Sequence, residues 1–224
     1  MRVLAIDTAL TACAVAIYDT DIGLIAKQSH DMVRGHAEAL MPMIARVMAE
    51  GRAQFDDIDR IAVTVGPGSF TGLRVGVAAA RGLALAAGKP AVGVTTLAAF
   101  AAPHAGKDER VTLSAVDARN DQVYIELFGA DGVALAAARI ATLPEAVEAA
   151  LAGPVRIVGN AAAAVAAFWL DRPPRPLAEQ TAAPDIITVA RLGVAASPHL
   201  AVPKPFYLRG PGARPQEPTR LLRR

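Results

Sequence analysis

An internal repeat limits the folds that are open to this chain. Residues Arg2 to Ile17 predict two short apolar strands around a polar turn, and the same strand–turn–strand unit is predicted again from Val111 to Phe128. An aspartate stands at the turn in both copies, Asp7 in the first and Asp117 in the second, 110 positions later. Because a repeated sequence unit implies a repeated structural unit, we expect an α/β protein with two lobes that each begin with a hairpin.

Strands and helices are predicted to alternate after the first hairpin. Apolar spacing indicates helices from His36 to Val47 and from Leu73 to Ala87, with a buried strand from Ile61 to Val65 between them. Further on we expect a strand, a short helix, a helix, a strand and alanine-rich helices, at 91–95, 97–102, 144–151, 155–158 and beyond 160. We assign residues 1–103 to an N-terminal lobe and 104–209 to a C-terminal lobe, and we expect the Pro- and Arg-rich tail 210–224 to be disordered.

Composition argues against several classes of protein. A hydrophobic fraction of 53% with only 4% aromatic residues predicts a core of Ala, Val, Leu and Ile. The single cysteine, Cys13, excludes an intrachain disulfide and a Cys-based zinc site, which fits a reducing compartment. No segment has the pattern of a signal peptide or a membrane-spanning helix. We therefore expect a cytoplasmic protein without a membrane role.

The formal charge of +2 is too small to indicate nucleic-acid binding by itself, but the basic residues gather near the end of the chain. Six of them follow position 203, against Glu217 alone: Lys204, Arg209, Arg214, Arg220, Arg223 and Arg224. This tail could contact RNA phosphates, although a solvated terminus is the more common reason for such a charge run.

A glycine-rich loop separates the strand at Ile61 to Val65 from the helix that follows. A helix N-terminus after such a loop can bind phosphate, but no Gly-Lys-Ser/Thr follows here, and the glycine and acidic positions of a dinucleotide fingerprint are missing. A tight turn in which Ser69 or Thr71 caps the helix is the favoured interpretation over anion binding. The loop residues that we single out are Gly66, Pro67, Gly68, Ser69, Thr71, Gly72 and Arg74.

The two helices beside this loop have more apolar surface than a single sheet needs. Gly72, Gly76 and Ala80 recur at four-residue spacing, methionines line the earlier helix, and Phe70 is either folded into the core or exposed for a partner. Residue patterns alone leave a protein interface and a monomer core equally open. The candidate interface residues are His36, Leu40, Met41, Ile44, Met48, Phe70, Leu73, Gly76, Val77 and Ala80.

Other catalytic chemistry has little support in the sequence. Asp7 and Asp117 stand where a hairpin could present a carboxylate to metal-bound phosphate, but a turn-capping aspartate is the commoner case. The four histidines form no His-x-x-x-His or His-Glu-x-x-His pair, so we expect no metal site. Cys13 has no evident base, and no nucleophile elbow occurs.

The run from Val63 to Ala84, with Gly-Pro-Gly-Ser-Phe-Thr-Gly-Leu-Arg at its centre, closely resembles the signature of the bacterial TsaB (YeaZ-type) family. Five shorter segments also agree with it in order and spread the resemblance over nearly the whole chain: Leu4 to Thr8, His36 to Pro42, Gly93 to Leu97, Val116 to Arg119 with Val123 and Tyr124, and Phe206 to Arg209. The chain departs from the usual pattern at Ala37, where serine is more common, and in its lengthened Pro/Arg tail.

This resemblance implies the duplicated two-lobed fold of actin, sugar kinases and heat-shock chaperones (ASKHA). It also implies a non-catalytic subunit, a pseudoenzyme that activates a TsaD-type threonylcarbamoyltransferase in the threonylcarbamoyladenosine modification of tRNA. The helices at His36 to Val47 and Leu73 to Ala87 would form the face that pairs with the catalytic subunit, or with a second copy when the chain is alone. A TsaE-type ATPase would join the assembly, and tRNA would be contacted only within it.

No cofactor is expected, although weak ATP or ADP binding at a vestigial site around Asp7 and Asp117 stays open. The alternative to the scaffold is an enzyme of the same superfamily, either an ATP-dependent phosphotransferase that uses these two aspartates or a glycopeptidase-like protein.

Overall fold

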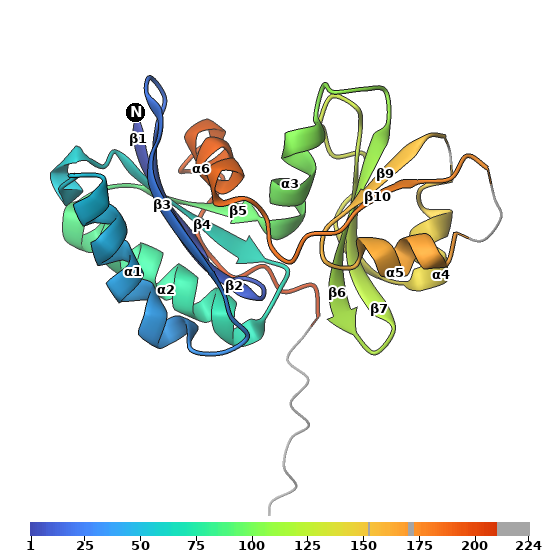
Figure 1. The fold of residues 1–224 in the computed structure, drawn as a ribbon, viewed down its shortest axis with the longest axis horizontal. Helices are drawn as coiled ribbons and strands as arrows, with labels where there is room; N and C mark the ends of the chain where they lie inside the picture. Colours follow the sequence, from blue (N-terminus) through green and yellow to red (C-terminus); the bar gives the residue numbers. More distant parts are fainter. Residues whose placement is uncertain (152, 170–172, 210–224) are drawn as a thin grey trace, which may run out of the picture.

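Two five-stranded mixed sheets form the framework of the protein (Figure 1). The structure is a computed structural model that describes residues 1–151, 153–169 and 173–209. The first sheet has the strand order β3-β2-β1-β4-β5, with β1 (Arg2–Asp7), β2 (Ala12–Asp19), β3 (Gly23–Asp31), β4 (Arg60–Gly66) and β5 (Ala91–Thr95). The second has the order β10-β9-β6-β7-β8, with β6 (Val111–Arg119), β7 (Gln122–Phe128), β8 (Arg139–Thr142), β9 (Val155–Val158) and β10 (Leu177–Glu179).

The two sheets have the same topology, which confirms the duplication expected from the repeat. In each sheet the first strand pairs antiparallel with the second and parallel with the fourth, and the second pairs antiparallel with the third. The repeated aspartates occupy equivalent places at the end of β1 and near the end of β6. The chain therefore has the expected two-lobed α/β architecture.

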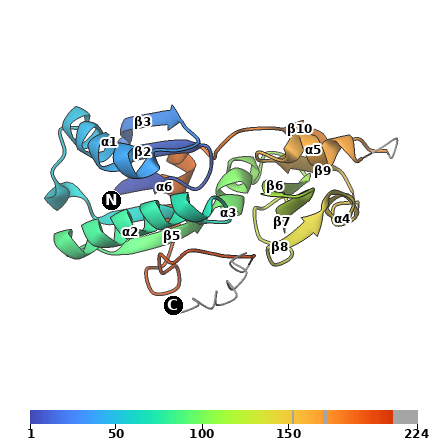
Figure 2. The ribbon, with the colours of Figure 1, turned by 90° about the horizontal axis from the view of Figure 1, so that it is seen from below.

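Helices cover both faces of the first sheet (Figures 1 and 2). On the face turned away from the second lobe lie α1 (His36–Glu50) and α2 (Phe70–Ala87); on the opposite face lie α3 (Thr96–Ala101) and α6 (Ile186–Ala195). The outer face of the second sheet carries α4 (Leu143–Glu148) and α5 (Ala162–Ala167), and two short 3₁₀ turns are η1 (Phe55–Asp57) and η2 (Ala102–His104).

Side-chain alternation along β1 explains why its two faces carry different helices. Leu4 and Ile6 point into the large core beneath α1 and α2, whereas Ala5 points to the other face, against α6. Small residues on that face allow a close approach, because a Cβ at Gly193 of α6 would overlap the Cβ of Ala62 on β4. The first lobe is thus packed on both sides of its sheet.

The position of α6 corrects the expected lobe boundary. The segment 104–209 was assigned as a whole to the C-terminal lobe, but α6 packs on β1, β2 and β4 of the first sheet. Its buried residues Ile186, Val189 and Ala190 join alanines of β1 and β2. The chain therefore returns to the first lobe after β10, and the C-terminal lobe by packing ends before residue 186. The expected disorder of 210–224 lies outside the described residues.

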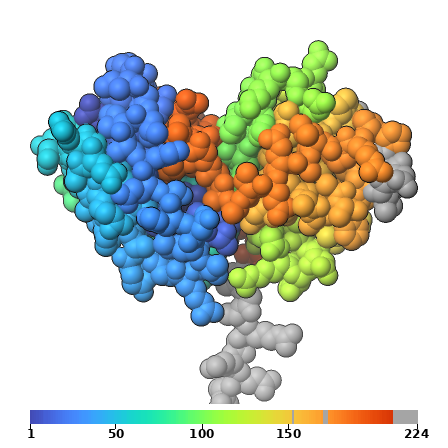
Figure 3. Space-filling model, in the orientation of Figure 1, coloured from blue at the N-terminus to red at the C-terminus, as the bar shows by residue number. Residues whose placement is uncertain are grey.

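The lobes touch through α3, which packs against β6 and β7 as well as against β4 and β5. Ser114 of β6 donates a hydrogen bond to the carbonyl of Leu97 in α3, 2.8 Å away. In Figure 3 the two lobes are separate masses that meet around the middle of the molecule. The last described residues add a second connection, which is described below.

Candidate functional site

The turn after β1 surrounds a fully buried aspartate. Asp7 Oδ1 accepts hydrogen bonds from the hydroxyl of Thr64, at 2.5 Å, and from the backbone N–H of Ala9, at 2.9 Å. Asp7 Oδ2 is also buried and has no partner among the described residues. Burial raises the pKa of this carboxyl above its ordinary value, and the Thr64 hydroxyl opposes that shift. Asp7 is therefore a packed group of the first lobe, shielded from solvent.

The glycine loop closes over this turn. The N–H of Ser69 donates to the carbonyl of Ala9 at 2.7 Å, and the Thr8 hydroxyl donates to the carbonyl of Gly72 at 2.7 Å. A Cβ at Gly68 would overlap the Ala9 carbonyl oxygen, and one at Gly72 would overlap that of Thr8. The loop glycines therefore permit a close backbone-to-backbone approach between the loop and the turn after β1.

The expected capped turn is confirmed. The Ser69 side chain accepts a hydrogen bond from the N–H of Gly72 at 3.3 Å, so that α2 begins at Phe70, three residues earlier than the apolar spacing indicated. Gly66, with a φ of 111°, precedes a cis peptide bond to Pro67. Serine is the capping residue, and Thr71 lies exposed in the first turn of the helix.

The second aspartate of the repeat has a different environment. Asp117 is exposed, and its Oδ1 accepts from the N–H of Arg119 at 2.8 Å within the β6–β7 hairpin. Asn120 and Asp121 at the tip have positive φ values of 53° and 56°, which this tight turn requires. Asp7 is thus buried at the turn that the glycine loop covers, whereas Asp117 is exposed and caps an open turn.

Most of the predicted interface residues belong to the monomer core, which corrects that prediction. Eight of the ten are buried between the helices and the first sheet: His36, Leu40, Ile44, Met48, Leu73, Gly76, Val77 and Ala80. His36, for example, places Nε2 3.2 Å from the carbonyl oxygen of Leu10 in the hairpin turn. Only Met41 and Phe70 reach the surface, with 49% and 44% of their area exposed.

A different set of residues forms the outer surface of α1 and α2, here called the outer helical face. Its uncharged members other than Thr71 are small or apolar: Ala37, Met41, Pro42, Ala45 and Ala49 of α1, and Phe70, Ala78, Gly82, Leu85 and Ala86 of α2. Leu85 is 86% exposed. By length and composition α2 is apolar enough to cross a membrane, and 33% of it is buried in this fold. The outer helical face is therefore unusually apolar for a surface, which is typical of a protein interface.

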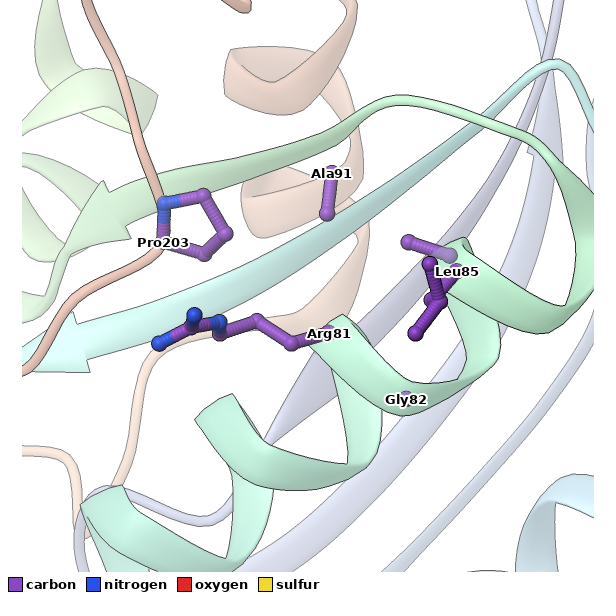
Figure 4. Close-up of a pocket in the computed structure, with 6 residues that line it drawn as sticks. Arg81, Gly82, Leu85, Ala91 and Pro203 are labelled. Atoms are coloured by element: carbon purple, nitrogen blue, oxygen red, sulfur yellow. The ribbon is translucent and has the colours of Figure 1, made fainter.

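A shallow depression adjoins this face where α2 ends (Figure 4). It is lined by Arg81, Gly82 and Leu85 of α2, by Ala91 of β5 and by Pro203 of the C-terminal segment. Its walls are mostly apolar, and only Arg81 brings a charge. This surface could receive an apolar side chain of a partner, but it has no grouping of polar residues that would orient a small ligand.

An aromatic cluster at the other end of α2 was not foreseen from the sequence. The rings of Phe70 and Tyr207 have centroids 5.2 Å apart, and the guanidinium carbon of Arg74 lies 3.8 Å from the centroid of Phe70. Arg74 Nε also donates to the Tyr207 hydroxyl at 3.2 Å. The resemblance had marked Phe206 to Arg209 as a motif, but only the three-dimensional structure brings it to the glycine loop, more than 130 residues earlier in the chain.

Cys13, the candidate nucleophile, is buried. Burial, together with the charge of Asp7, raises the pKa of the Cys13 thiol to about 11, which disfavours a thiolate nucleophile. Within the described residues no three His, Cys, Asp or Glu side chains are grouped so that they could hold a metal ion.

The fold and these contacts can be compared with known proteins. Residues 25–186 match the family model described as TsaD, tRNA N6-adenosine threonylcarbamoyltransferase. The chain belongs to this family. The tRNA threonylcarbamoyladenosine biosynthesis protein TsaB of Escherichia coli is 39% identical over 125 residues, which are 55% of this chain and 53% of that protein. An uncharacterised Mycobacterium tuberculosis protein is 35% identical over 217 residues, 95% of this chain and 94% of the relative.

Solved structures agree with the sequence relatives. YeaZ from Pseudomonas aeruginosa superposes with a TM-score of 0.72 at 25% identity, over 92% of this chain and 99% of that one. Together these comparisons confirm that the protein is of the TsaB (YeaZ) type and that it has the two-lobed fold. The match to the Escherichia coli TsaB spans about half of its length. TsaB relatives link the family to threonylcarbamoyladenosine biosynthesis.

Proposed function

We propose that this TsaB-type chain is a non-catalytic subunit that activates a TsaD-type threonylcarbamoyltransferase in the threonylcarbamoyladenosine modification of tRNA. The observation that carries the proposal is the outer helical face, in which large exposed side chains such as Leu85, Phe70 and Met41 lie among alanines and glycines. Such a surface gains free energy when a partner covers it.

The environment of Asp7 supports a role without phosphoryl transfer. A carboxylate that holds metal-bound phosphate needs access to the ligand, but Asp7 is enclosed by Thr64, Ala9 and the glycine loop. The same backbone contacts give the first turn of α2 a fixed position. The glycine signature therefore serves to place α2, and with it the outer helical face.

The partner of this face is proposed from the family match and from the chemistry of the surface. The catalytic TsaD-type subunit would cover α1 and α2, and a second copy of the chain would do so when the subunit is absent. We place the assembly in the cytoplasm, with a TsaE-type ATPase as a further component and with tRNA bound only in the complex. A stable interface of this kind buries more than about 1,000 Å² in total.

The test is a threonylcarbamoyl-transfer assay with the cognate catalytic subunit, the ATPase and tRNA, with and without this chain. The proposal expects transfer that depends on the chain, because a subunit without chemistry of its own can act only through its partner. Full transfer by the catalytic subunit without the chain would reject the activating role. Transfer by the chain alone would reject its non-catalytic character.

A further inference from the structure

The cluster of Phe70, Arg74 and Tyr207 combines exposure with fixed geometry. Phe70 is 44% exposed and Tyr207 is 42% exposed, yet both rings are held by their contacts with each other and with Arg74. Tyrosine and arginine are enriched among the residues that dominate protein–protein binding energies. The cluster lies at the start of α2, where the outer helical face begins.

Arg74 has hydrogen-bonding capacity that the fold leaves unused. Its Nε donates to Tyr207, while its two terminal nitrogens have no partner among the residues that the structure describes. The guanidinium plane is fixed from one side by the Phe70 ring and at Nε by the Tyr207 hydroxyl. A planar guanidinium held in this way loses little conformational entropy when it binds a carboxylate through two parallel hydrogen bonds.

Residues before and after Tyr207 in the sequence fix the position of the C-terminal segment. The N–H of Phe206 donates to the carbonyl of Val65 at 2.7 Å, at the end of β4. Two residues beyond Tyr207, Arg209 Nη1 donates to the carbonyl of Ala118 at 3.0 Å, and its Nη2 donates to the side chain of Gln122 in the second lobe. The segment from Phe206 to Arg209, here called the C-terminal clasp, therefore joins both lobes and keeps Tyr207 in place.

The positive charge of α2 indicates which chemical group of a bound partner would contact this helix. Arg74 and Arg81 are the charged residues of this helix, both are exposed, and no acidic residue occurs between Phe70 and Ala87. A protein that covers α2 must leave these cations in contact with acceptors, because a buried unpaired charge is costly. A carboxylate opposite Arg74 satisfies this requirement.

We propose that Arg74, stacked on Phe70 and positioned by Tyr207 of the C-terminal clasp, binds an aspartate or glutamate carboxylate of the partner subunit. This inference rests on the proposed function and adds a recognition group to it. The clasp thereby becomes part of the interface, although Tyr207 is far from α2 in the sequence. Neither Arg74 nor Tyr207 has a role in chemistry under this proposal; Arg74 contacts the partner, and Tyr207 is a positioning residue.

A protein carboxylate explains the cluster better than an RNA does. Bases stack on free ring faces, but one face of Phe70 is already covered by Arg74, and Tyr207 packs against the same ring. The nearby hairpin that binds Arg209 carries the exposed acids Asp117 and Asp121 against Arg119, and this net negative charge disfavours a phosphate backbone. In contrast, the apolar residues of α2 continue directly from the cluster.

The test measures the dissociation constant of the full-length chain and its cognate TsaD-type subunit, for the wild type and for Arg74→Ala, Arg74→Lys and Tyr207→Phe. Arg74→Ala should weaken binding about ten-fold or more. Arg74→Lys should weaken it nearly as much, because lysine keeps the charge but loses the planar fork and the stacking. Tyr207→Phe, which keeps the ring and removes the hydrogen bond, should weaken it by a few-fold, roughly two to five.

The matched control is Arg191→Ala, because Arg191 forms a similar pair with Tyr18, at 5.6 Å, on α6 and away from the outer helical face. Its dissociation constant should equal that of the wild type, and all variants should show the wild-type thermal midpoint. Wild-type binding with an unchanged constant for Arg74→Ala overturns the inference and leaves the proposed function intact. Absence of wild-type binding overturns both. Unchanged protein binding with lower tRNA affinity in Arg74→Ala also overturns it, in favour of an RNA contact.

Discussion

Gly72 and Gly82 both lie in α2, but substitution by alanine should change the free energy of unfolding in opposite directions at the two positions. Gly72→Ala places a Cβ against the carbonyl oxygen of Thr8 and should lower the free energy of unfolding by roughly 1–3 kcal/mol or more. At Gly82 the added Cβ meets nothing within 4 Å, so the better helix propensity of alanine should raise stability by about 0.5–1 kcal/mol.

Urea unfolding of both variants checks this pair. The comparison separates the steric role of Gly72 from the general effect of glycine in a helix, because both positions are within α2. Equal destabilisation by the two substitutions would mean that close approach to the Asp7 turn does not explain the glycine signature.

Asp7 should make the stability of the protein depend on pH in an unusual direction. Burial raises its pKa in the folded state above the ordinary value of 3.8, so the folded protein binds this proton more tightly than the unfolded chain does. The contribution of Asp7 to the free energy of unfolding therefore rises as the pH falls through the folded-state pKa towards 3.8.

The variant Asp7→Asn cannot titrate at this position and serves as the reference. The difference in unfolding free energy between wild type and Asp7→Asn should move in favour of the wild type as the pH is lowered from about 8 to about 4.5. Other groups, such as Asp108 with its pKa lowered to about 2, are common to both proteins and cancel in this difference. A difference that is constant over this range would show that the Asp7 carboxyl is not in a desolvated site.

Neighbouring positions on α2 separate the core from the outer helical face. Val77 is 4% exposed and packs in the large core of the first lobe, whereas Ala78 is exposed beside it. Val77→Glu should unfold the chain, because it buries an unpaired charge. Ala78→Glu should leave the chain folded, with a wild-type circular dichroism spectrum, and should prevent association with the partner as measured by analytical ultracentrifugation.

The same pair of positions shows what the sequence could reveal about this helix. Apolar periodicity locates the stripe of a helix that packs against a sheet, and it identified Val77, Leu73 and Ala80 correctly as one face. It cannot say whether that stripe is covered by the same chain or by another. Here the sheet covers it, and the outer surface of α2 consists mainly of alanine, glycine and arginine with a few large residues, which carry no periodic signal of their own.

Strand β3 was not predicted and helix α6 was assigned to the wrong lobe, for physical reasons that differ. Strand β3 is an edge strand whose second half, from Lys27 to Asp31, is polar and mostly exposed, so it lacks the apolar run of a buried strand. Helix α6 has a clear apolar face, but nothing local states which of two similar sheets it covers. The repeat predicted the two hairpins and the topology around them because those features recur within the chain itself.

On the scale of the whole molecule, the C-terminal clasp connects the two lobes. Truncation after Val202 removes the Phe206, Tyr207 and Arg209 contacts, and it should lower the free energy of unfolding by on the order of 2 kcal/mol, since it exposes part of the first core and removes several hydrogen bonds. Truncation after Arg209 keeps every one of these contacts and should preserve the wild-type stability.

Differential scanning calorimetry of the two truncated chains tests this prediction. The shorter chain should unfold at a lower temperature and with a broader transition, because the lobes then contact each other mainly through α3. Equal transitions for both truncations would mean that the clasp does not couple the lobes. In that case Tyr207 would also lack the support on which its place beside Arg74 depends.

Activation of a catalytic partner through the outer helical face is tested most directly by the initial rate of threonylcarbamoyl transfer to tRNA. In this measurement the chain is titrated into a fixed amount of the TsaD-type subunit, with Ala78→Glu titrated in parallel. We predict that the rate rises from a low baseline and saturates at equal amounts of the two subunits, and that folded Ala78→Glu leaves the baseline unchanged. A rate that is independent of the chain, or equal activation by Ala78→Glu, would contradict the claim.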